Sequence, residues 1–490
     1  MYKKDELYKD CSKDMTFDEC QIIILRNAVD KVEKNKEKII LTDDVKQVIL
    51  IVEKFLISKK LICYGGSAIN NILPKNEQFY NRDVNIPDYD FYSPNALNDA
   101  KELADLYFKS GYENVEAKSA IHYGTFKVFV NYIPIADITQ IPKILFTRLV
   151  EDSISINGIL YVPVNFLRMN LFSELSRPSG DVSRWEKLLK RLILLNKHYP
   201  FIPDKKCSSI KFQRKLTTKT KNSDKLYTLT RDTLIDSEVV FFGGYALSLY
   251  GQYLDKNYKK IVDKIPDFDV LSIEPDKTAM ILSKILVANE FENIKIIKHP
   301  NAGEIIPYHV EVRVGEDTIV FIYKPIACHS YNKIQLNDGK EIMIASIDTI
   351  LSFYLAFYYV NKPYYDKLRL LCMAAFLFEV EEKNKLKQTG LLKRFSINCY
   401  GKQETINDIR ELKAKKFKQL KHDKTARKYN LHFLKYYPAE PYLKNNYTEK
   451  FHKYRFKAFD KKNTKRTKRT KRTKRTKRTK RTKNKSIWFF

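Results

Sequence analysis

The sequence predicts an α/β (α+β) fold in which two similar mixed-sheet modules follow each other in tandem. The first observation is an apolar run, residues 61–64, that enters a Gly-Gly turn and precedes an Asp-x-Asp motif beginning 22 residues after Gly66. The second is that the same order recurs at Gly244 and Asp267, which are 23 residues apart. The third is that strand-like apolar runs alternate with stretches at helical spacing, as in α/β proteins.

The expected elements of the first module follow in chain order. Helical spacing predicts a helix that Thr42 can cap, with an apolar face formed by Val45, Val48, Ile49, Val52, Phe55 and Leu56. Residues 61–64 should form the strand that leads into the turn, and residues 96–108 a further helix. The polar stretch 76–87 predicts an insertion loop.

Length and charge indicate the number of domains and the class of partner. The 490 residues suffice for two to four domains of about 100–200 residues each, and an apolar content of 44% allows a core. The net charge is +31, of which residues 461–485 carry 16 positive charges and no negative one, which leaves +15 elsewhere. A basic body favours a polyanionic partner.

The cysteine pattern and the hydropathy further narrow the class of protein to which the chain can belong. The seven cysteines are scattered without a Cys-x-x-Cys spacing, which argues against a zinc site and against a disulfide scaffold, and fits a reducing cytoplasm. Residues 1–6 lack the apolar core of a signal peptide. The most apolar stretch, residues 344–360, carries Asp348 and is expected to be a buried helix, so no membrane contact is expected.

Three aspartates give the strongest chemical signal. Asp88 and Asp90 should face the same way, because side chains alternate along a strand. Asp137 lies within an apolar strand, residues 133–138, where a carboxylate is costly unless it is paired or bound to metal. Such hard oxygen ligands suit Mg²⁺ or Mn²⁺, and two ions could clamp the attacking and leaving oxygens of an in-line displacement.

The turn formed by Gly65, Gly66 and Ser67 is the expected nucleotide-binding element. It lies between a strand and a helix, so its backbone N–H groups can approach a triphosphate. With the three aspartates downstream, the set is typical of nucleotidyl transfer onto a hydroxyl.

A predicted helix with basic residues follows the turn and the three aspartates in the sequence. Ser183 and Glu186 have capping-box spacing, and the helix after them should bury Trp185, Leu188, Leu189, Leu192 and Leu195. Lys187, Lys190 and Arg191 lie mostly off that face. They form either a solvated basic face or contacts to triphosphate or RNA.

These motifs resemble those of a known family, the poly(A) polymerase catalytic subunits of large cytoplasmic DNA viruses, of the poxvirus and giant-virus type. The family is part of the polymerase-beta-like nucleotidyltransferase superfamily. The resemblance covers roughly residues 40–455. Besides the aspartates it is carried by residues 121–127, 167–172, 176–181, 184–187, 364–367, 392–395 and 399–403. The Arg-Pro-Ser-Gly-Asp run at 177–181 is more specific than the aspartate pattern.

The resemblance implies template-independent polyadenylation of mRNA 3′ ends, with AMP transferred from ATP to the RNA 3′-hydroxyl and pyrophosphate released. It implies that Asp88 and Asp90 bind both metal ions, and that Asp137 holds the ion that lowers the pKa of the attacking hydroxyl. It further implies a location in the host cytoplasm, in viral factories, or in the virion. It is compatible with a homodimer or with a separate processivity subunit.

Two alternatives remain open at this point. One is another RNA terminal nucleotidyltransferase, such as a uridylyltransferase, because the motifs do not select the base. The other is a catalytically silent RNA-binding scaffold. The intact set of three aspartates argues against the scaffold.

The second module is expected to be degenerate. Tyr245 follows its Gly-Gly pair where the first module has serine, and the run 319–323 carries no acid where the third aspartate should fall. Glu311 could substitute, but it aligns nearer Lys127. We therefore expect this module to serve packing and RNA binding.

The predicted organisation divides the chain into five parts: a helical region 1–40, the catalytic domain 41–200, a linker 201–237, the degenerate module with a helical C-terminal region 238–455, and a disordered basic tail 456–490. The region 391–452 is basic and aromatic. RNA-facing or merely solvated cations there are Lys393, Arg394, Lys402, Lys413, Lys415 and Lys416. The tail contains six Thr-Lys-Arg repeats, which can neutralise phosphates without sequence preference.

Overall fold

The structure is a computed structural model. It describes residues 10–12, 14–40, 43–80, 88–214, 223–254, 267–302, 305–336, 338–360 and 362–438. The predictions made for the Thr-Lys-Arg tail and for Thr42 lie outside these residues.

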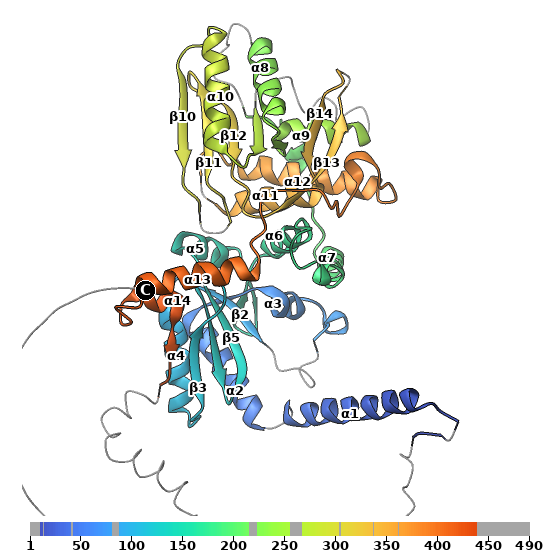
Figure 1. The fold of residues 1–490 in the computed structure, drawn as a ribbon, viewed down its shortest axis with the longest axis vertical. Coiled ribbons are helices and arrows are strands. Elements are labelled where there is room, and N and C mark those ends of the chain that lie inside the picture. The colour runs from blue at the N-terminus through green and yellow to red at the C-terminus, as the bar shows by residue number, and fades with distance from the viewer. Residues whose placement is uncertain are drawn as a thin grey trace, which may run out of the picture. The chain divides into compact units, whose positions relative to one another are not determined.

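The first module is an eight-stranded sheet in the order β16-β3-β4-β5-β2-β1-β7-β6 (Figure 1). Its strands are β1 (Ile62–Cys63), β2 (Tyr89–Ser93), β3 (Val115–Ser119), β4 (Thr125–Val130), β5 (Ile133–Gln140), β6 (Ile154–Ile156), β7 (Ile159–Tyr161) and the distant β16 (Lys435–Tyr436). Its helices are α2 (Asp43–Lys59), α3 (Gly65–Ile72), α4 (Ala96–Lys109), α5 (Lys143–Glu151), α6 (Val164–Leu175) and α7 (Trp185–His198), with the short η1 (Lys75–Glu77) and η2 (Val182–Arg184). α1 (Phe17–Ile40) precedes them, in the region predicted to be helical.

The second module is also an eight-stranded sheet, in the order β10-β11-β12-β9-β8-β14-β13-β15. Its strands are β8 (Val240–Phe241), β9 (Phe268–Leu271), β10 (Ile294–His299), β11 (His309–Val314), β12 (Asp317–Tyr323), β13 (His329–Gln335), β14 (Glu341–Ala345) and β15 (Cys399–Tyr400). Its helices are α8 (Ser223–Asp236), α9 (Gly244–Tyr250), α10 (Pro275–Ala288), α11 (Ile347–Tyr359) and α12 (Lys367–Lys383), with the short η3 (Lys205–Ser209), η4 (Gly251–Tyr253) and η6 (Gly390–Leu392).

The two sheets repeat one topology strand by strand. β3-β4-β5-β2-β1-β7-β6 corresponds in order to β10-β11-β12-β9-β8-β14-β13. The pairs β2·β5 and β1·β7 are parallel, as are their counterparts β9·β12 and β8·β14, whereas the other pairs within both sets are antiparallel. The predicted duplication and the mixed α/β fold class are confirmed.

The helices begin and end much as the apolar spacing predicts. α2 buries Val45, Val48, Val52, Phe55 and Leu56 on one face. α11 is buried on nearly all sides, and the Ser346 hydroxyl caps it by accepting from the Thr349 N–H at 3.3 Å. That all-round burial explains the apolar run at 344–360 without a membrane. Among the described residues, no helix combines the length and apolar composition needed to cross a bilayer.

Two segments are arranged differently from the predicted organisation. The stretch 201–237, predicted to be a linker, contains α8, which packs on α10 and buries Leu226 and Leu234. The stretch was predicted to be a linker because polar and basic residues surround these apolar ones in the sequence. α14 (Arg427–Phe433) packs on β3 of the first module, and α13 (Ile406–Leu420) packs on α14, although both were predicted to belong with the second module. In the first module β16 extends the sheet beside β3, and Lys413 donates to the Ala120 carbonyl.

α6 and α11 occupy corresponding places after β7 and β14, and they pack against each other. The ring of Phe166 on α6 meets that of Tyr359 on α11 edge-on at 5.2 Å. The Ser330 N–H donates to the Ser176 carbonyl at 2.8 Å, so the segment after α6 also contacts β13. The apolar residues of both modules therefore join in one continuous core.

The cysteines contradict the expectation of no disulfide framework. Disulfides join Cys11 to Cys20, Cys207 to Cys372 and Cys328 to Cys399, and only Cys63 is free, and buried. The last two pairs are separated by 165 and 71 residues. The tertiary fold brings these cysteines together, so no short spacing in the sequence indicates the pairs.

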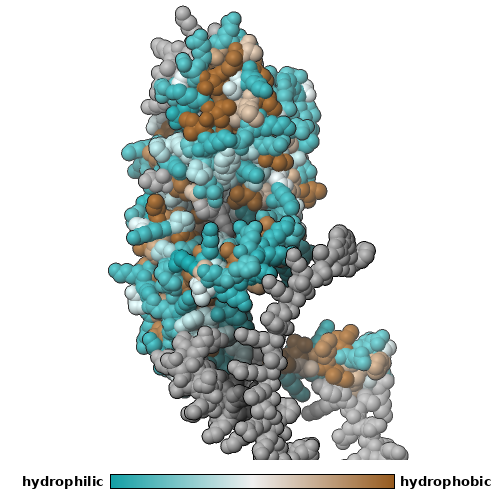
Figure 2. All heavy atoms as spheres, turned by 60° about the vertical axis from the view of Figure 1, so that its left-hand side comes forward, coloured by the Kyte–Doolittle hydropathy of each residue, from teal (hydrophilic) through white to brown (hydrophobic). Residues whose placement is uncertain are grey.

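The surface carries some apolar residues among hydrophilic ones. Figure 2 brings forward the face of the second module that carries β10 and α10, where apolar side chains gather. The exposed apolar residues of these two elements are Met280, Ile281, Val287 and Ile296. α1 also exposes apolar residues, namely Phe17, Ile22, Ile24, Leu25, Val29 and Val32.

Candidate active site

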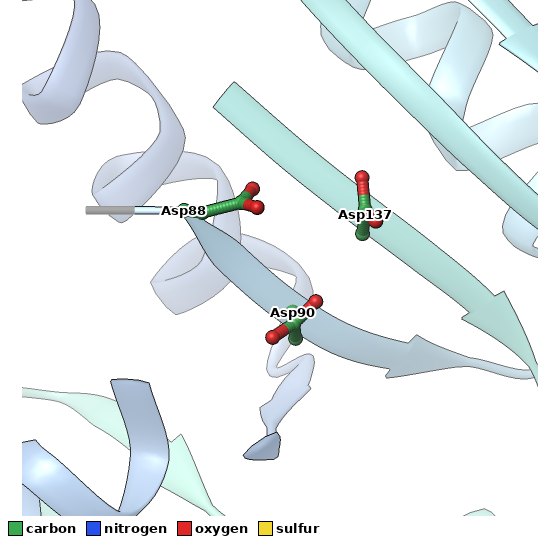
Figure 3. A group of neighbouring side chains, drawn as sticks. All are labelled: Asp88, Asp90 and Asp137. Carbon is green, nitrogen blue, oxygen red and sulfur yellow. The ribbon is translucent and has the colours of Figure 1, made fainter. Parts of the chain in front are cut away.

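Three carboxylates converge on the open face of the first sheet. On β2, Tyr89 and Phe91 are buried, so Asp90 points to the opposite face, and Asp88 precedes it with the same orientation. On β5, Asp137 lies directly beside Asp90 in the parallel register. Figure 3 shows the three side chains pointing toward one another from these two strands.

The spacing of the carboxylates fits a metal centre. Each of Asp88, Asp90 and Asp137 offers an oxygen within 4.8 Å of the others. In the part of the chain that the structure describes, Oδ1 of Asp137 is buried and has no hydrogen-bond partner. A buried, unpaired carboxylate oxygen is costly, and a hard cation would satisfy it. The three residues therefore fit Mg²⁺ or Mn²⁺.

The site is electrostatically strained when only protein groups are considered. Burial, followed by the nearby charges of Asp88 and Asp137, raises the pKa of Asp90 to about 7. Desolvation raises the pKa of Asp88 as well, with Asp137 as the next cause. Like charges in one partly dry site disfavour ionisation, and bound cations reverse that effect.

Lys127 is a member of the site that was not singled out from the sequence. It lies opposite Asp137 in the antiparallel register of β4 and β5, and its ammonium group forms an ion pair with that carboxylate. The alternation of β4 buries Phe126, Val128 and Val130 and leaves Lys127 on the open face. This alternation around a lysine, one strand before Asp137, was the signal available in the sequence.

The predicted turn joins the carboxylates to a helix N-terminus. Gly65 adopts a φ of +74°, and a Cβ there would lie 2.7 Å from Oδ2 of Asp90, so glycine is required by both conformation and space. Gly66 and Ser67 follow Gly65 in the first turn of α3, which no side chain caps. The Ser67 hydroxyl donates to the Asp88 carbonyl at 2.8 Å. The turn is therefore fixed beside the aspartates, with its N–H groups directed outward.

The basic helix differs from its prediction at its start. α7 begins at Trp185 after the short η2, and the Ser183 hydroxyl bonds to Asp181 rather than capping the helix. The predicted capping box is therefore wrong, because the segment before α7 is already a helical turn. Leu188, Leu192 and Leu195 are buried as predicted, but Arg191 is buried with them.

The second module places a guanidinium where the first has room for metal. Asp267 and Asp269 are the counterparts of Asp88 and Asp90, and Arg214 forms ion pairs with both. Phe321 lies beside Asp269 in the parallel register, where Asp137 lies beside Asp90. The predicted absence of a third acid is confirmed.

Glu311 does not replace the missing acid. It lies opposite Phe321 on β11, which is the place of Lys127 opposite Asp137, as the sequence spacing predicted. Its carboxylate is buried and is bound by His299, Arg313 and Thr318. Glu311 therefore belongs to a separate polar cluster.

The C-terminal cations separate into internal and exposed groups. Arg394 is ion-paired with Asp348 and Glu381, so the expectation that it faces RNA is wrong. Lys413 is tied to the first module through the Ala120 carbonyl. Lys393, Lys402, Lys415 and Lys416 are the remaining candidates for an RNA surface.

Comparison with known proteins bears on the first module most directly. Residues 50–181, which contain the turn and all three aspartates, match the family described as Poly(A) polymerase catalytic subunit. The predicted family resemblance is confirmed. A protein of African swine fever virus, provisionally named as such a subunit, is 32% identical over 184 residues, which cover 35% of this chain and 38% of the viral protein. A mimivirus protein with the same provisional name is 31% identical over 155 residues, or 31% of this chain and 26% of its own length.

The alignments thus span well under half of either viral relative. A solved structure extends the likeness to the whole fold. The crystal structure of the Megavirus polyadenylate synthase matches this chain with a TM-score of 0.70 at 20% identity, and it covers 92% of both chains. At that identity the match establishes the fold, and both modules are part of it.

Proposed function

We propose that this protein is a polynucleotide adenylyltransferase that adds AMP from ATP to the 3′-hydroxyl of mRNA without a template and releases pyrophosphate. The observation that carries the proposal is the convergence of Asp88, Asp90 and Asp137 beside an uncapped helix N-terminus. Carboxylates that gather hard cations and N–H groups that receive phosphates are the two parts that nucleotidyl transfer requires.

Each group of the chain has a distinct part in this reaction. Asp88 and Asp90 would hold both metal ions, and Asp137 would hold one of them. Gly65, Gly66 and Ser67 cradle the triphosphate through their backbone N–H groups. Lys127 holds the Asp137 carboxylate in position through their ion pair while the substrates exchange. When bound, Mg²⁺ or Mn²⁺ supplies charge neutralisation and a more acidic hydroxyl.

The substrates and surroundings are part of the same proposal. The RNA 3′ end reaches the carboxylates along basic surface, to which exposed lysines of α13 contribute. Activity takes place in the host cytoplasm, in viral factories, or in the virion. The active assembly is a homodimer or includes a separate processivity subunit.

The test is extension of a labelled oligoribonucleotide with ATP, UTP, CTP or GTP supplied separately, in the presence of Mg²⁺ or Mn²⁺. The proposal expects metal-dependent addition with ATP preferred. Preference for UTP would make the protein a uridylyltransferase. Absence of addition with every nucleotide and both metals, by a folded protein that binds RNA, would leave the scaffold alternative.

The Asp137→Ala variant shows whether any activity belongs to this site. Asp152→Ala is the matched control, because Asp152 lies in the same module and forms its ion pair with Arg148 near the surface.

A further inference from the structure

The N-terminus of α3 lies against a buried guanidinium. The first turn of α3 has no side-chain cap, so its N–H groups carry the positive end of the helix dipole. A Cβ added at Gly66 would lie 2.9 Å from Nη1 and 3.1 Å from Nη2 of Arg191. The guanidinium can therefore approach the turn this closely because residue 66 has no side chain.

Arg191 reaches this position from α7, and it is only 6% exposed. Its guanidinium lies 4.7 Å from the ring centre of Phe79 and 5.5 Å from that of Tyr80, and Nη2 donates to the Tyr80 hydroxyl at 2.6 Å. Among the described residues its Nε has no hydrogen-bond partner. A buried cation beside a positive helix end is unfavourable unless an anion completes the arrangement.

The aromatic pair is itself held in place from both helices. The side-chain oxygen of Asn70, on α3, accepts from the N–H groups of Phe79 and Tyr80, each at 2.8 Å. Glu77 is ion-paired with Lys197 on α7. Because the Tyr80 oxygen accepts from Arg191, its own O–H remains able to donate to a ligand.

The turn separates this cation from the carboxylates. Gly65 faces Asp90, and Gly66 faces Arg191. A triphosphate that places its α-phosphate at the carboxylates and runs along the turn would bring its terminal phosphates to Arg191. The α-phosphate would thus lie near Asp90, and the phosphates that leave as pyrophosphate would lie near Arg191.

The second module provides an internal comparison. A Cβ at Gly244, the counterpart of Gly66, would lie 3.2 Å from Cγ of Gln213 and 3.6 Å from the Phe212 carbonyl oxygen. A neutral side chain and a carbonyl oxygen fill the place that Arg191 takes in the first module. Among the described residues, the atoms nearest to Gly244 thus belong to uncharged groups, unlike those nearest to Gly66.

We infer that Arg191 and Tyr80 bind the terminal phosphates of a nucleoside triphosphate, and the pyrophosphate that leaves, at the N-terminus of α3. The planar guanidinium suits two-point contact with phosphate oxygens, and the helix end contributes further donors. This inference rests on the proposed function for the identity of the ligand, whereas the anion site itself rests on the geometry alone.

The experiment measures affinity without turnover. Inorganic pyrophosphate, AMP and an ATP analogue with a non-cleavable α–β linkage are titrated calorimetrically into the full-length protein with Mg²⁺ and without RNA. Arg191→Gln should weaken the binding of pyrophosphate and of the analogue by about 10- to 100-fold, because charged hydrogen bonds are lost, and AMP binding should stay nearly unchanged. Arg191→Lys should recover part of the loss.

Two further variants distinguish a specific loss of binding from a loss caused by unfolding. Tyr80→Phe keeps the guanidinium and removes only one hydroxyl, so a smaller loss of the same selectivity is expected. Lys190→Gln removes a cation from the exposed side of α7, where Lys190 pairs with Glu186, and should bind all three ligands like the wild type.

Equal loss for AMP and pyrophosphate in Arg191→Gln, or no loss for pyrophosphate, would overturn the inference. Loss confined to an oligoribonucleotide, measured by filter binding, would assign Arg191 to RNA and would also overturn it. Failure of the proposed function is a separate result: a wild type that adds no nucleotide but binds pyrophosphate through Arg191 retains the anion site.

Discussion

The guanidinium of Arg214 lies 3.3 Å from a carboxylate oxygen of Asp269. It also pairs with Asp267, so one side chain neutralises the two aspartates that correspond to Asp88 and Asp90 of the first module. Burial raises the pKa of Asp269, and the Arg214 charge opposes that rise. In the second module the Arg214 guanidinium thus occupies the place where the first module is proposed to hold a metal ion.

This relationship predicts that the double variant Asp267→Ala, Asp269→Ala keeps nucleotide addition substantially active but loses stability. Removing both acids leaves a buried guanidinium unpaired, which typically costs about 3–5 kcal/mol. Denaturant unfolding beside single-turnover extension checks both parts. A folded double variant as inactive as Asp137→Ala would mean that the second module is catalytic.

The first module should respond in the opposite way. Asp137→Ala or Asp90→Ala should abolish extension, by about 10³-fold or more, while RNA binding and the fold remain. The physical reason is that these carboxylates would hold the metal ions that stabilise charge in the transition state, and they contribute little to packing. Single-turnover rates with Asp152→Ala as control decide it, and wild-type rates in either variant would refute the site.

The raised pKa of Asp90 predicts a pH-dependent response to metal. Because the pKa rises from 3.8 to about 7, the stability that protonated Asp90 contributes is complete below pH 3.8 and is lost as the pH rises through about 7. Mg²⁺ binds the ionised form, so its stabilising effect should grow over the same range. Thermal unfolding with and without Mg²⁺ at pH 6 and pH 8 measures this.

Asp90→Asn provides the control for that measurement, since it removes the titrating group and should flatten the pH dependence of the Mg²⁺ effect. An equal Mg²⁺ effect at both pH values in the wild type would show that Asp90 does not govern metal binding.

How far the sequence could predict this molecule depends on the range of each interaction. Strand alternation and the turn are local, so Asp88, Asp90 and Asp137 could be assembled into one site before any coordinates. The repeated spacing likewise predicted the second module and the loss of its third acid at Phe321. These features follow a regular spacing along the chain, and such spacing can be recognised from the sequence alone.

The features that escaped are contacts between distant segments. Arg191 lies on a helix whose other cations are exposed, and only the packing of α7 against Phe79 brings it to Gly66. Arg214 comes from a stretch predicted to be a linker. The disulfide between Cys207 and Cys372 spans 165 residues. In each case tertiary packing brings the two residues together, and no regular spacing in the sequence indicates the pair.

Removing residues 464–490 should weaken RNA binding without slowing the chemical step. The segment carries 14 Lys or Arg and no carboxylate side chain, and it offers no candidate catalytic group. Each single-strand phosphate that it neutralises contributes about 0.7 to the slope of log K against log salt. The truncated protein should therefore show weaker binding and a flatter slope, yet reach the wild-type single-turnover rate at saturating RNA.

Filter binding at several salt concentrations, beside single-turnover extension, measures both effects. A full-length variant with Gln in place of every Lys and Arg of the repeats is the matched control, because it keeps the length and removes only the charge. If charge is the cause, this variant should behave like the truncated protein. An unchanged salt slope would show that the repeats do not contact RNA, and a collapsed rate at saturating RNA would show that they act beyond binding.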